Sequence, residues 1–285
     1  MARAQEITEQ IGSLNELLEI VAALRAIAAV QMQQSQRSLD AIRDYAEIIR
    51  RALAEAATLL PEDGDGSAVG NPRRPGLVVF CSEHGFCGSF NDPLIRAAAD
   101  AAKSQRNLQL IFVGTRGAQR ASERGLRPAL TLSMATHSGG VTAVARKVAA
   151  ELYRRFMAQA LTSVEMIFTR EATGQRASLN RLKLLPLEAP AVEANHPGLP
   201  PIVNLSPRRL FDELAAEYMF AMLEAGAMDS FASENAARFR TMDAAHENID
   251  NKAKELNRTM RRMRQEAVTT EVLELIGGFE AMKRR

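Results

Sequence analysis

The apolar positions near the C-terminal end of the chain repeat with the period of a helix that packs against another helix. After Pro207 no proline occurs, and glycine appears only at Gly226, Gly277 and Gly278. So long a stretch without helix breakers predicts one long helix over residues 206–285, or two helices joined near Gly226. Such a helix would be on the order of 110 Å long, more than a small domain is wide, so another element has to cover its apolar side.

Two sets of positions within this stretch recur every seven residues. The first set is Met242, Ile249, Leu256, Met263 and Thr270, and the second is His246, Ala253, Met260, Ala267 and Glu274. Because the residues between them are mostly charged or polar, the pattern predicts a coiled-coil seam that is well formed in the middle and weakens toward the C-terminus. The alternative is an ordinary long helix with a solvated face.

A second long helix is predicted over residues 1–60, which contain no proline and a single glycine, Gly12. Its apolar positions also fall seven apart, at Ile7, Leu14, Val21 and Ala28, with a companion series at Ile11, Leu18 and Met32 that Arg25 interrupts. Two such helices at opposite ends of one chain predict an antiparallel coiled coil. The alternative is two amphipathic helices that pack separately on a central domain.

Between these helices the pattern changes to short apolar runs that alternate with helical segments. Strands are predicted over residues 76–81, 108–113 and 163–169, with 181–187 as a candidate fourth, and helices over 91–105, 116–124 and 139–161. Alternating strands and helices predict a Rossmann-like α/β domain with parallel pairing. The expected organisation is an N-terminal coiled-coil helix (1–60), a central α/β domain (76–188) and a C-terminal coiled-coil helix (206–285), hence a mixed α/β and α+β fold.

Composition narrows the function classes. The chain has 285 residues, 25% of them charged, and a formal net charge of +2, which argues against a nucleic-acid-binding protein. It lacks a run of about 18 apolar residues, so no membrane-spanning helix is expected. The N-terminus does not have the layout of a signal peptide, and two cysteines close together do not make a disulfide framework. These features predict a protein of the reducing cytoplasm.

Two glycine-rich turns follow predicted strands, at residues 85–88 and 114–117. Glycine-rich turns can bind phosphate at a helix N-terminus, but neither turn fits a nucleotide fingerprint, so a purely structural turn is favoured at both. Cys81, His84 and Cys87 are spaced three apart, yet a structural zinc site needs four ligands and the other histidines stand alone in the sequence. We therefore expect no metal, no cofactor and no catalytic residue.

The charged residues of the C-terminal helix include a cluster of arginines: Arg258, Arg261, Arg262 and Arg264. With Glu255 and Glu266 nearby, these arginines could form a self-paired surface. Alternatively they contact carboxylates of a partner protein, because the planar guanidinium group can hold a carboxylate with two hydrogen bonds.

Three parts of the chain resemble the gamma subunit of F-type ATP synthases. The C-terminal helix carries Ser233-Glu234-Asn235-Ala236-Ala237-Arg238, then Met242, Ala245 and Asn248, then Arg264, Gln265, Thr269, Glu271 and Glu274. The N-terminal helix carries Glu6-Ile7, Ile11, Ser13, Ala28-Ala29, Met32, Ser35-Gln36 and Tyr45-Ala46. In the middle, residues 82–88 (SEHGFCG) followed by Asn91 are similar to that family's S-D-R-G-L-C-G-x-x-N turn. The match covers essentially the whole chain in the right order.

The resemblance implies a non-catalytic rotor subunit that couples ion flow through the membrane to ATP synthesis or hydrolysis. Its implied partners are the alpha and beta ATPase subunits, the epsilon subunit and the ring of c subunits, on the cytoplasmic face of a bacterial inner membrane. Carried over by position, Arg264 and Gln265 would contact the catch loop of a beta subunit, and Thr269, Glu271 and Glu274 would lie in the segment coupled to it. An α/β ligand-binding protein or a scaffold with coiled-coil arms is the alternative.

The N-terminal helix departs from the family pattern. The family has a basic stretch around K-I-T-K-A-M, whereas this chain has Glu19-Ile20-Val21-Ala22-Ala23-Leu24, and Gln31 stands where lysine is common. These differences imply a divergent bacterial branch with altered electrostatic contacts along this helix. Whether the complex moves protons or sodium ions stays open, because the c ring determines ion specificity.

Overall fold

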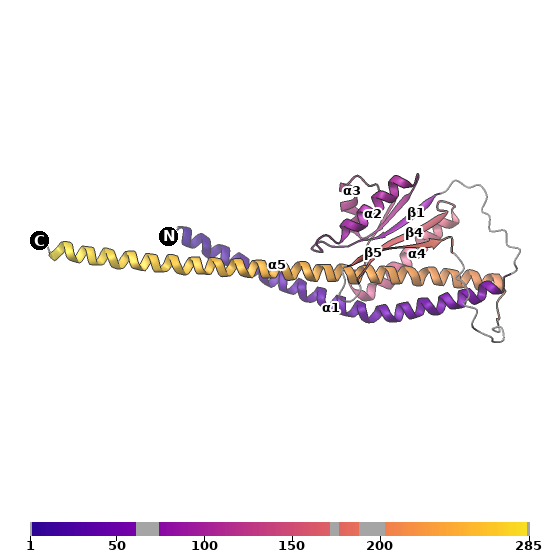
Figure 1. Ribbon diagram of the computed structural model, residues 1–285, viewed down its shortest axis with the longest axis horizontal. Coiled ribbons are helices and arrows are strands. Elements are labelled where there is room, and N and C mark those ends of the chain that lie inside the picture. Colours follow the sequence, from indigo (N-terminus) through magenta and orange to yellow (C-terminus); the bar gives the residue numbers. More distant parts are fainter. Residues whose placement is uncertain (1, 61–73, 172–176, 188–202, 284–285) are drawn as a thin grey trace. The chain divides into compact units, whose positions relative to one another are not determined.

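Two long helices dominate the computed structural model, which describes residues 2–60, 74–171, 177–187 and 203–283 (Figure 1). Helix α1 spans Ala2–Thr58 and helix α5 spans Pro207–Lys283 without a break at Gly226. The chain divides into two compact units, here called the end unit (Met1–Ile27 with Phe239–Arg285) and the sheet unit (Ala28–Arg238). The division into segments 1–60, 76–188 and 206–285 stays a prediction.

The described residues of the sheet unit form five strands and the shorter helices. The strands are β1 (Pro75–Phe80), β2 (Gln109–Val113), β3 (Leu130–Leu132), β4 (Ser163–Arg170) and β5 (Ser178–Leu185). The helices are α2 (Asn91–Ser104), α3 (Thr115–Glu123) and α4 (Val141–Met157), with the 3-10 turn η1 (Ser138–Gly140) before α4. The predicted central elements are all present, and β3 is an addition.

The strand order is β3-β2-β1-β4-β5. β1 pairs in parallel with β2 and β4, and β2 pairs in parallel with β3, as the alternation of strands and helices predicts. β5 differs, since it pairs antiparallel with β4. Only seven residues join these two strands, whereas a parallel crossover takes a dozen or more. The sheet is therefore a parallel Rossmann-like core with one antiparallel edge strand.

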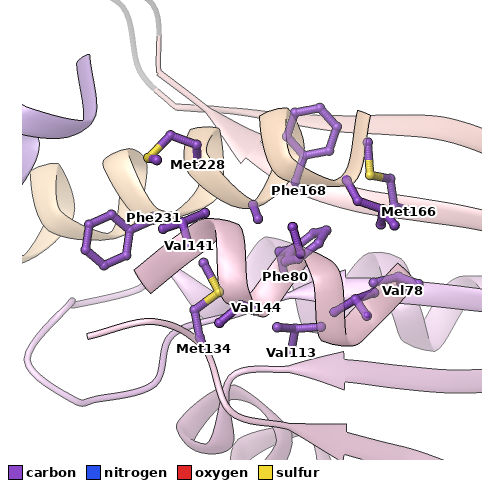
Figure 2. Packing of buried hydrophobic residues seen from close by; sticks show 14 of the residues in the cluster. Val78, Phe80, Val113, Met134, Val141, Val144, Met166, Phe168, Met228 and Phe231 are labelled. Atoms are coloured by element: carbon purple, nitrogen blue, oxygen red, sulfur yellow. The ribbon is translucent and has the colours of Figure 1, made fainter. Parts of the chain in front are cut away.

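Each face of the sheet is covered by helices, and residues alternate between the two faces along each strand. In β1, Leu77 and Val79 face a cluster formed with α2 and α3, whereas Val78 and Phe80 face a cluster formed with α4, α5 and α1. Figure 2 shows ten labelled side chains of the second cluster, Val78, Phe80, Val113, Met134, Val141, Val144, Met166, Phe168, Met228 and Phe231. Burial on both faces explains why the parallel strands are apolar throughout.

One stretch of α5 is buried on nearly all sides. Residues 223–236 are all buried, which is unlike the one-sided pattern of a surface helix. Gly226 lies in this stretch, and a Cβ there would come within 3.0 Å of the Met166 side chain. The glycine is therefore not a break between two helices but a point of close approach between the helix and the sheet.

Within the sheet unit, α1 runs antiparallel to α5. Arg43 pairs with Asp229 and Tyr45 donates a hydrogen bond to Glu217, so increasing numbers in α1 meet decreasing numbers in α5. The seven-residue stripe of α1 continues here as buried Leu39, Ala46 and Leu53. The buried Ser35 continues the other series, seven residues after Ala28, where apolar patterning alone finds no core residue.

Within the end unit, the same two helices supply the predicted seam residues. Ile7 of α1 and Met242, Ala253 and Met260 of α5 are buried. Arg25, the exception in the apolar series of α1, forms an ion pair with Asp243. The predicted coiled coil is thus confirmed, including its weakening toward the C-terminus, because Ala267 and Thr270 are exposed.

The turn between β2 and α3 packs directly against the end of β1. Gly114 has a φ of 122°, and a Cβ at this position would lie 2.3 Å from the carbonyl oxygen of Cys81. A Cβ at Gly117 would lie 2.1 Å from the Cys81 Cβ. This turn therefore needs glycine at both positions to keep β1 and α3 in contact.

We predict that Gly114→Ala lowers the free energy of unfolding by about 2 kcal/mol or more, because it combines a disfavoured φ with a steric overlap. Urea unfolding followed by circular dichroism measures the change. Gly12→Ala is the control, since nothing lies within 4 Å of a Cβ there and alanine stabilises a helix interior by up to about 1 kcal/mol. Equal stability of Gly114→Ala and the unchanged chain would contradict the packing argument.

Candidate functional site

The site residues predicted from the sequence lie near the C-terminal end of α5. Arg264, Gln265, Thr269 and Glu271 are all exposed, and the side chain of Glu274 lies outside the described part of the structure. The Thr269 hydroxyl donates a hydrogen bond to the Gln265 carbonyl oxygen at 2.8 Å. Arg264 and Glu271 are seven residues apart and so share one face of the helix. In the part of the chain that the structure describes, no other element covers these side chains, so a partner protein could contact them.

This part of α5 extends past the start of α1 within the end unit (Figure 1). Arg25 lies opposite Asp243, so an antiparallel pair places Ala2 opposite about residue 266. The last 17 or so residues of α5, about 25 Å of helix, therefore run without α1 beside them. Large apolar side chains are exposed along this stretch: Val268, Val272, Leu273, Leu275 and Ile276.

The arginine cluster of α5 is exposed at Arg258, Arg261, Arg262 and Arg264. The nearby Glu255 pairs with Lys252, so it is not taken up by an arginine of the cluster. Glu255 is therefore not available to pair with the arginines, as a self-paired surface would require. Contact of the arginines with carboxylates of a partner protein stays a prediction.

A second group of functional candidates lies where α5 crosses the ends of the strands in the sheet unit. Asp229 is 2% exposed and forms ion pairs with two arginines. Its Oδ1 lies 2.6 Å from Nη2 of Arg43 in α1, and its Oδ2 lies 2.8 Å from Nη2 of Arg170 at the end of β4. Removing a carboxylate from water costs several kcal/mol, and two guanidinium groups on its two oxygens offset that cost. One side chain of α5 thus joins three elements.

Two serines of α5 bind the same strand ends. The Ser230 hydroxyl donates to the carbonyl oxygen of Phe80 at the end of β1, and the Ser233 hydroxyl donates to the carbonyl oxygen of Thr169 near the end of β4. Both distances are 3.0 Å, and both serines are buried. β1 and β4 flank the point where the strand order reverses, which is where Rossmann-like sheets bind ligands. Here α5 occupies that place.

The N-terminus of α3 is also occupied by a group of the chain itself. One carboxylate oxygen of Glu83 accepts hydrogen bonds from the backbone N–H groups of Thr115 and Met134, at 3.0 and 2.7 Å. The other oxygen accepts from the Thr115 hydroxyl at 2.9 Å. A phosphate in a nucleotide-binding sheet would use such donors, so the Glu83 carboxylate stands in the phosphate's position.

The turn over residues 82–91 is closed by Asn91. Its side-chain oxygen accepts from the Ser82 N–H at 3.0 Å, and its amide donates to the Ser82 hydroxyl at 2.7 Å. Asn91 is the first residue of α2 but does not cap it, because Phe90 is the cap residue and has no capping side-chain bond. The similarity to the S-D-R-G-L-C-G-x-x-N turn thus rests on turn closure rather than helix capping.

Cys81, His84 and Cys87 do not form one cluster, since both thiols are buried and His84 is exposed. Burial raises the pKa of both thiols above their ordinary value, which keeps them protonated and poor as metal ligands. Over the described residues, no three metal-ligating side chains come together.

Glu234 and Arg238 fasten α5 to the 82–91 turn. Arg238 pairs with Glu234 and donates to the carbonyl oxygen of Gly85 through two nitrogens, at 3.3 and 3.4 Å. Burial raises the pKa of the Glu234 carboxyl to about 7, the neighbouring Glu83 adds to the rise, and Arg238 works against it. This carboxyl therefore titrates near neutral pH.

Gln31, where lysine is common in the family that the sequence resembles, also has a defined contact. Its side-chain oxygen accepts a hydrogen bond from the backbone N–H of Ser138 at 3.0 Å. A lysine side chain could not accept this bond. At this position, glutamine in place of the family's lysine thus provides a hydrogen bond to the backbone of Ser138. Glu19 and Ile20, which also depart from the basic pattern, are exposed.

The comparisons with known proteins agree with this architecture. The sequence model of the family described as ATP synthase matches residues 3–282. The chain belongs to this family. The ATP synthase gamma chain of Ralstonia nicotianae is 29% identical, covering 99% of this chain and 100% of the relative. Those of Desulforamulus reducens and a Geobacter species are 25% and 27% identical over the same shares. The predicted gamma subunit of an F-type ATP synthase is thereby confirmed.

Solved structures show the same fold at low sequence identity. A chain of the Euglena gracilis mitochondrial ATP synthase superposes with a TM-score of 0.62 at 14% identity, covering 99% of this chain and 95% of that one. A chain of the Tetrahymena thermophila mitochondrial ATP synthase, from its central stalk and c-ring, gives 0.58 at 18% identity, with shares of 79% and 99%. Among the described residues of this gamma chain, no helix has the length and apolar character needed to span a bilayer.

Asp229, Arg43 and Arg170 are a functional set that the sequence alone does not reveal. A signal for Asp229 was present, because it is a charged residue within the apolar run from Met219 to Ala232. Its two arginines lie 186 and 59 residues away, so only the fold brings them together.

We predict that Glu234→Gln removes part of the pH dependence of stability. Because the folded-state pKa of about 7 lies above the ordinary 4.5, the folded chain binds the proton more tightly than the unfolded chain. This contribution to stability therefore falls as the pH rises from about 4.5 to 7, by on the order of 3 kcal/mol. Urea unfolding at pH 5 and pH 8 should show a smaller difference for the variant.

The matched control for this prediction is Glu213→Gln, which removes an exposed carboxylate that pairs with Arg209 on the same helix. Its pH dependence should follow that of the unchanged chain. A pH dependence of Glu234→Gln equal to the control's would show that the buried carboxyl does not titrate in this range.

Proposed function

We propose that this gamma chain is the non-catalytic rotor subunit of an F-type ATP synthase, and that it couples ion flow through a membrane ring of c subunits to catalysis in alpha and beta subunits. The observation that carries the proposal is the unaccompanied C-terminal end of α5, a single exposed helix with apolar side chains. An isolated helix of that length is marginal in water, and exposed apolar residues favour a surrounding protein surface.

The arrangement of α5 on the sheet supports a non-catalytic role. Ser230 and Ser233 fill the place at the strand ends where a nucleotide would bind, and Glu83 uses the donors that would bind its phosphate. A nucleotide would have to displace buried hydrogen bonds and meet the negative charge of Glu83. These contacts favour chemistry in the partner subunits, with this chain acting by shifting populations of their conformations.

The surface of the C-terminal end of α5 supports the predicted contact with a beta subunit. Arg264 and Gln265 are exposed and adjacent, and between them they offer a charged fork and an amide. Thr269 and Glu271 follow within two turns of the same helix. We propose that these residues, with Glu274, bias which beta subunit is open as the helix turns.

The proposed location is the cytoplasmic face of a bacterial inner membrane, with membrane association only through the complex. The related solved structures include the central stalk with the c-ring of Tetrahymena thermophila and F1 with the c-ring of Euglena gracilis. By analogy, alpha and beta subunits, an epsilon subunit and a c ring are the proposed partners of this chain.

The experiment that tests the function is purification of the tagged chain from its native host. Alpha and beta ATPase subunits should copurify with it in a complex that hydrolyses ATP. The alternative, an α/β ligand-binding protein with coiled-coil arms, predicts tight stoichiometric binding of ATP to the isolated chain. Such binding, or the absence of ATPase subunits from the purified material, would overturn the proposed function.

We predict that Arg264→Ala combined with Gln265→Ala lowers the ATPase rate of the reconstituted complex by on the order of tenfold, because it removes a charged contact and an amide contact to the beta subunit. The isolated variant should unfold like the unchanged chain, since both side chains are exposed. The double variant Asn251→Ala with Lys252→Ala, which also removes an exposed amide and an exposed cation of α5 but lies outside the arginine cluster, is the control. An unchanged rate in the Arg264 and Gln265 variant would refute the contact.

A further inference from the structure

A rotor that transmits torque needs a joint that holds its long helix at one angle about the helix axis. In the sheet unit, Met228 and Phe231 of α5 belong to the same buried apolar cluster as Phe80, Met166 and Phe168 of the sheet (Figure 2). Apolar contact is non-directional and scales with buried area, so it opposes separation more than turning. Directional bonds have to supply the rest.

The directional bonds that α5 makes to the strands, among the residues that the structure describes, lie on one face of the helix; Glu224 and Arg238, on other faces, bond to Thr142 of α4 and to the 82–91 turn. Asp229, Ser230 and Ser233 fall within about 100° of helical rotation. Their partners are the last residues of two adjacent strands: the carbonyl oxygen of Phe80 in β1, and the Thr169 carbonyl oxygen and Arg170 guanidinium in β4. A turn of α5 about its axis by one residue position, about 100°, would break all three links at once.

Asp229 links α5 both to the sheet and to α1, and it uses a different carboxylate oxygen for each link. One carboxylate oxygen binds Arg170 of the sheet, with the guanidinium Nε at 2.9 Å and Nη2 at 2.8 Å. The other oxygen binds Arg43 of α1 at 2.6 Å. The link from sheet to helix and the link from helix to helix therefore use different arginines, both partly exposed, at 43% and 37% of the side chain.

We propose that Asp229, Ser230 and Ser233 form the torque joint of this subunit, with Arg170 as the positioning residue that fixes the rotational register of α5 on the sheet. The proposal rests on the proposed rotor function. Arg170 contacts no reacting group. It acts by holding Asp229 so that force on the sheet turns α5 rather than slipping past it.

The test uses the whole complex in inverted membrane vesicles and two readouts, the ATP hydrolysis rate and the ATP-driven membrane potential from a voltage-sensitive dye. The potential is independent of which cation is moved. Arg170→Gln should lower the potential formed per ATP hydrolysed by a factor of about 2 or more, which is the lower end of the couplings between groups in one network. The ion pair between Arg43 and Asp229 remains in this variant. The buried carboxylate therefore keeps a partner, and the chain stays folded.

Three comparisons make the result decisive. Arg43→Gln breaks only the helix-to-helix link and should leave the ratio of potential to hydrolysis near that of the unchanged complex. Arg170→Lys keeps the charge and should restore most of the ratio. Adding Ser230→Ala and Ser233→Ala to Arg170→Gln should lower the ratio further, since the two carbonyl oxygens then lose their directional bonds.

The joint would be refuted by an unchanged ratio in both Arg170→Gln and the triple variant, or by an equal loss in Arg43→Gln. A merely structural role would lower complex yield and thermal stability without changing the ratio, and that outcome also refutes the joint. Failure of the underlying function is separate: the unchanged complex would then show no copurifying ATPase subunits and no ATP-driven potential.

Discussion

The burial of one stretch of α5 on nearly all sides is the constraint on which the sheet unit depends. Residues 223–236 lie between the sheet, α4 and α1, so every neighbour has to fit this helix. Side chains such as Leu223, Met228 and Phe231 each contribute about 1.5–3 kcal/mol by leaving water. Gly226 marks a point of close approach to the sheet, because a Cβ there would come within 3.0 Å of the Met166 side chain. The apolar strands and the seam of α1 follow from the need to enclose this stretch.

Enclosure of a helix creates a problem that apolar packing does not solve. A buried cylinder can rotate or slide unless polar groups set its register, and a misplaced polar group in the core costs several kcal/mol. In this chain the buried Asp229, Ser230 and Ser233 all have partners at strand ends, and Glu234 has Arg238. The polar side chains of α5 thus specify one arrangement among the many that the apolar contacts would allow.

The two long helices and most of the sheet could be predicted from the sequence because their signals are local. The seven-residue spacing from Ile7 to Ala28 and from Met242 to Met263 is visible without a structure. β3 was missed because its three residues are too few to carry a period, and the antiparallel direction of β5 depends on the length of its connection. Arg25 looked like a flaw in the seam, yet it pairs with Asp243, which is 218 residues away. Long-range pairs of this kind have no local pattern.

The sequence also could not show that side chains of this chain fill the position where a Rossmann-like sheet binds its ligand. In such sheets, the crevice beside the strand-order reversal and the helix N-terminus next to it are where ligands bind. Here the Ser230 and Ser233 hydroxyls fill the first position and the Glu83 carboxylate fills the second. The donors and acceptors that would hold a nucleotide instead hold α5 and the 82–91 turn. The same strand ends that provide binding in other proteins here provide attachment, which is what a subunit that transmits force to its partners requires.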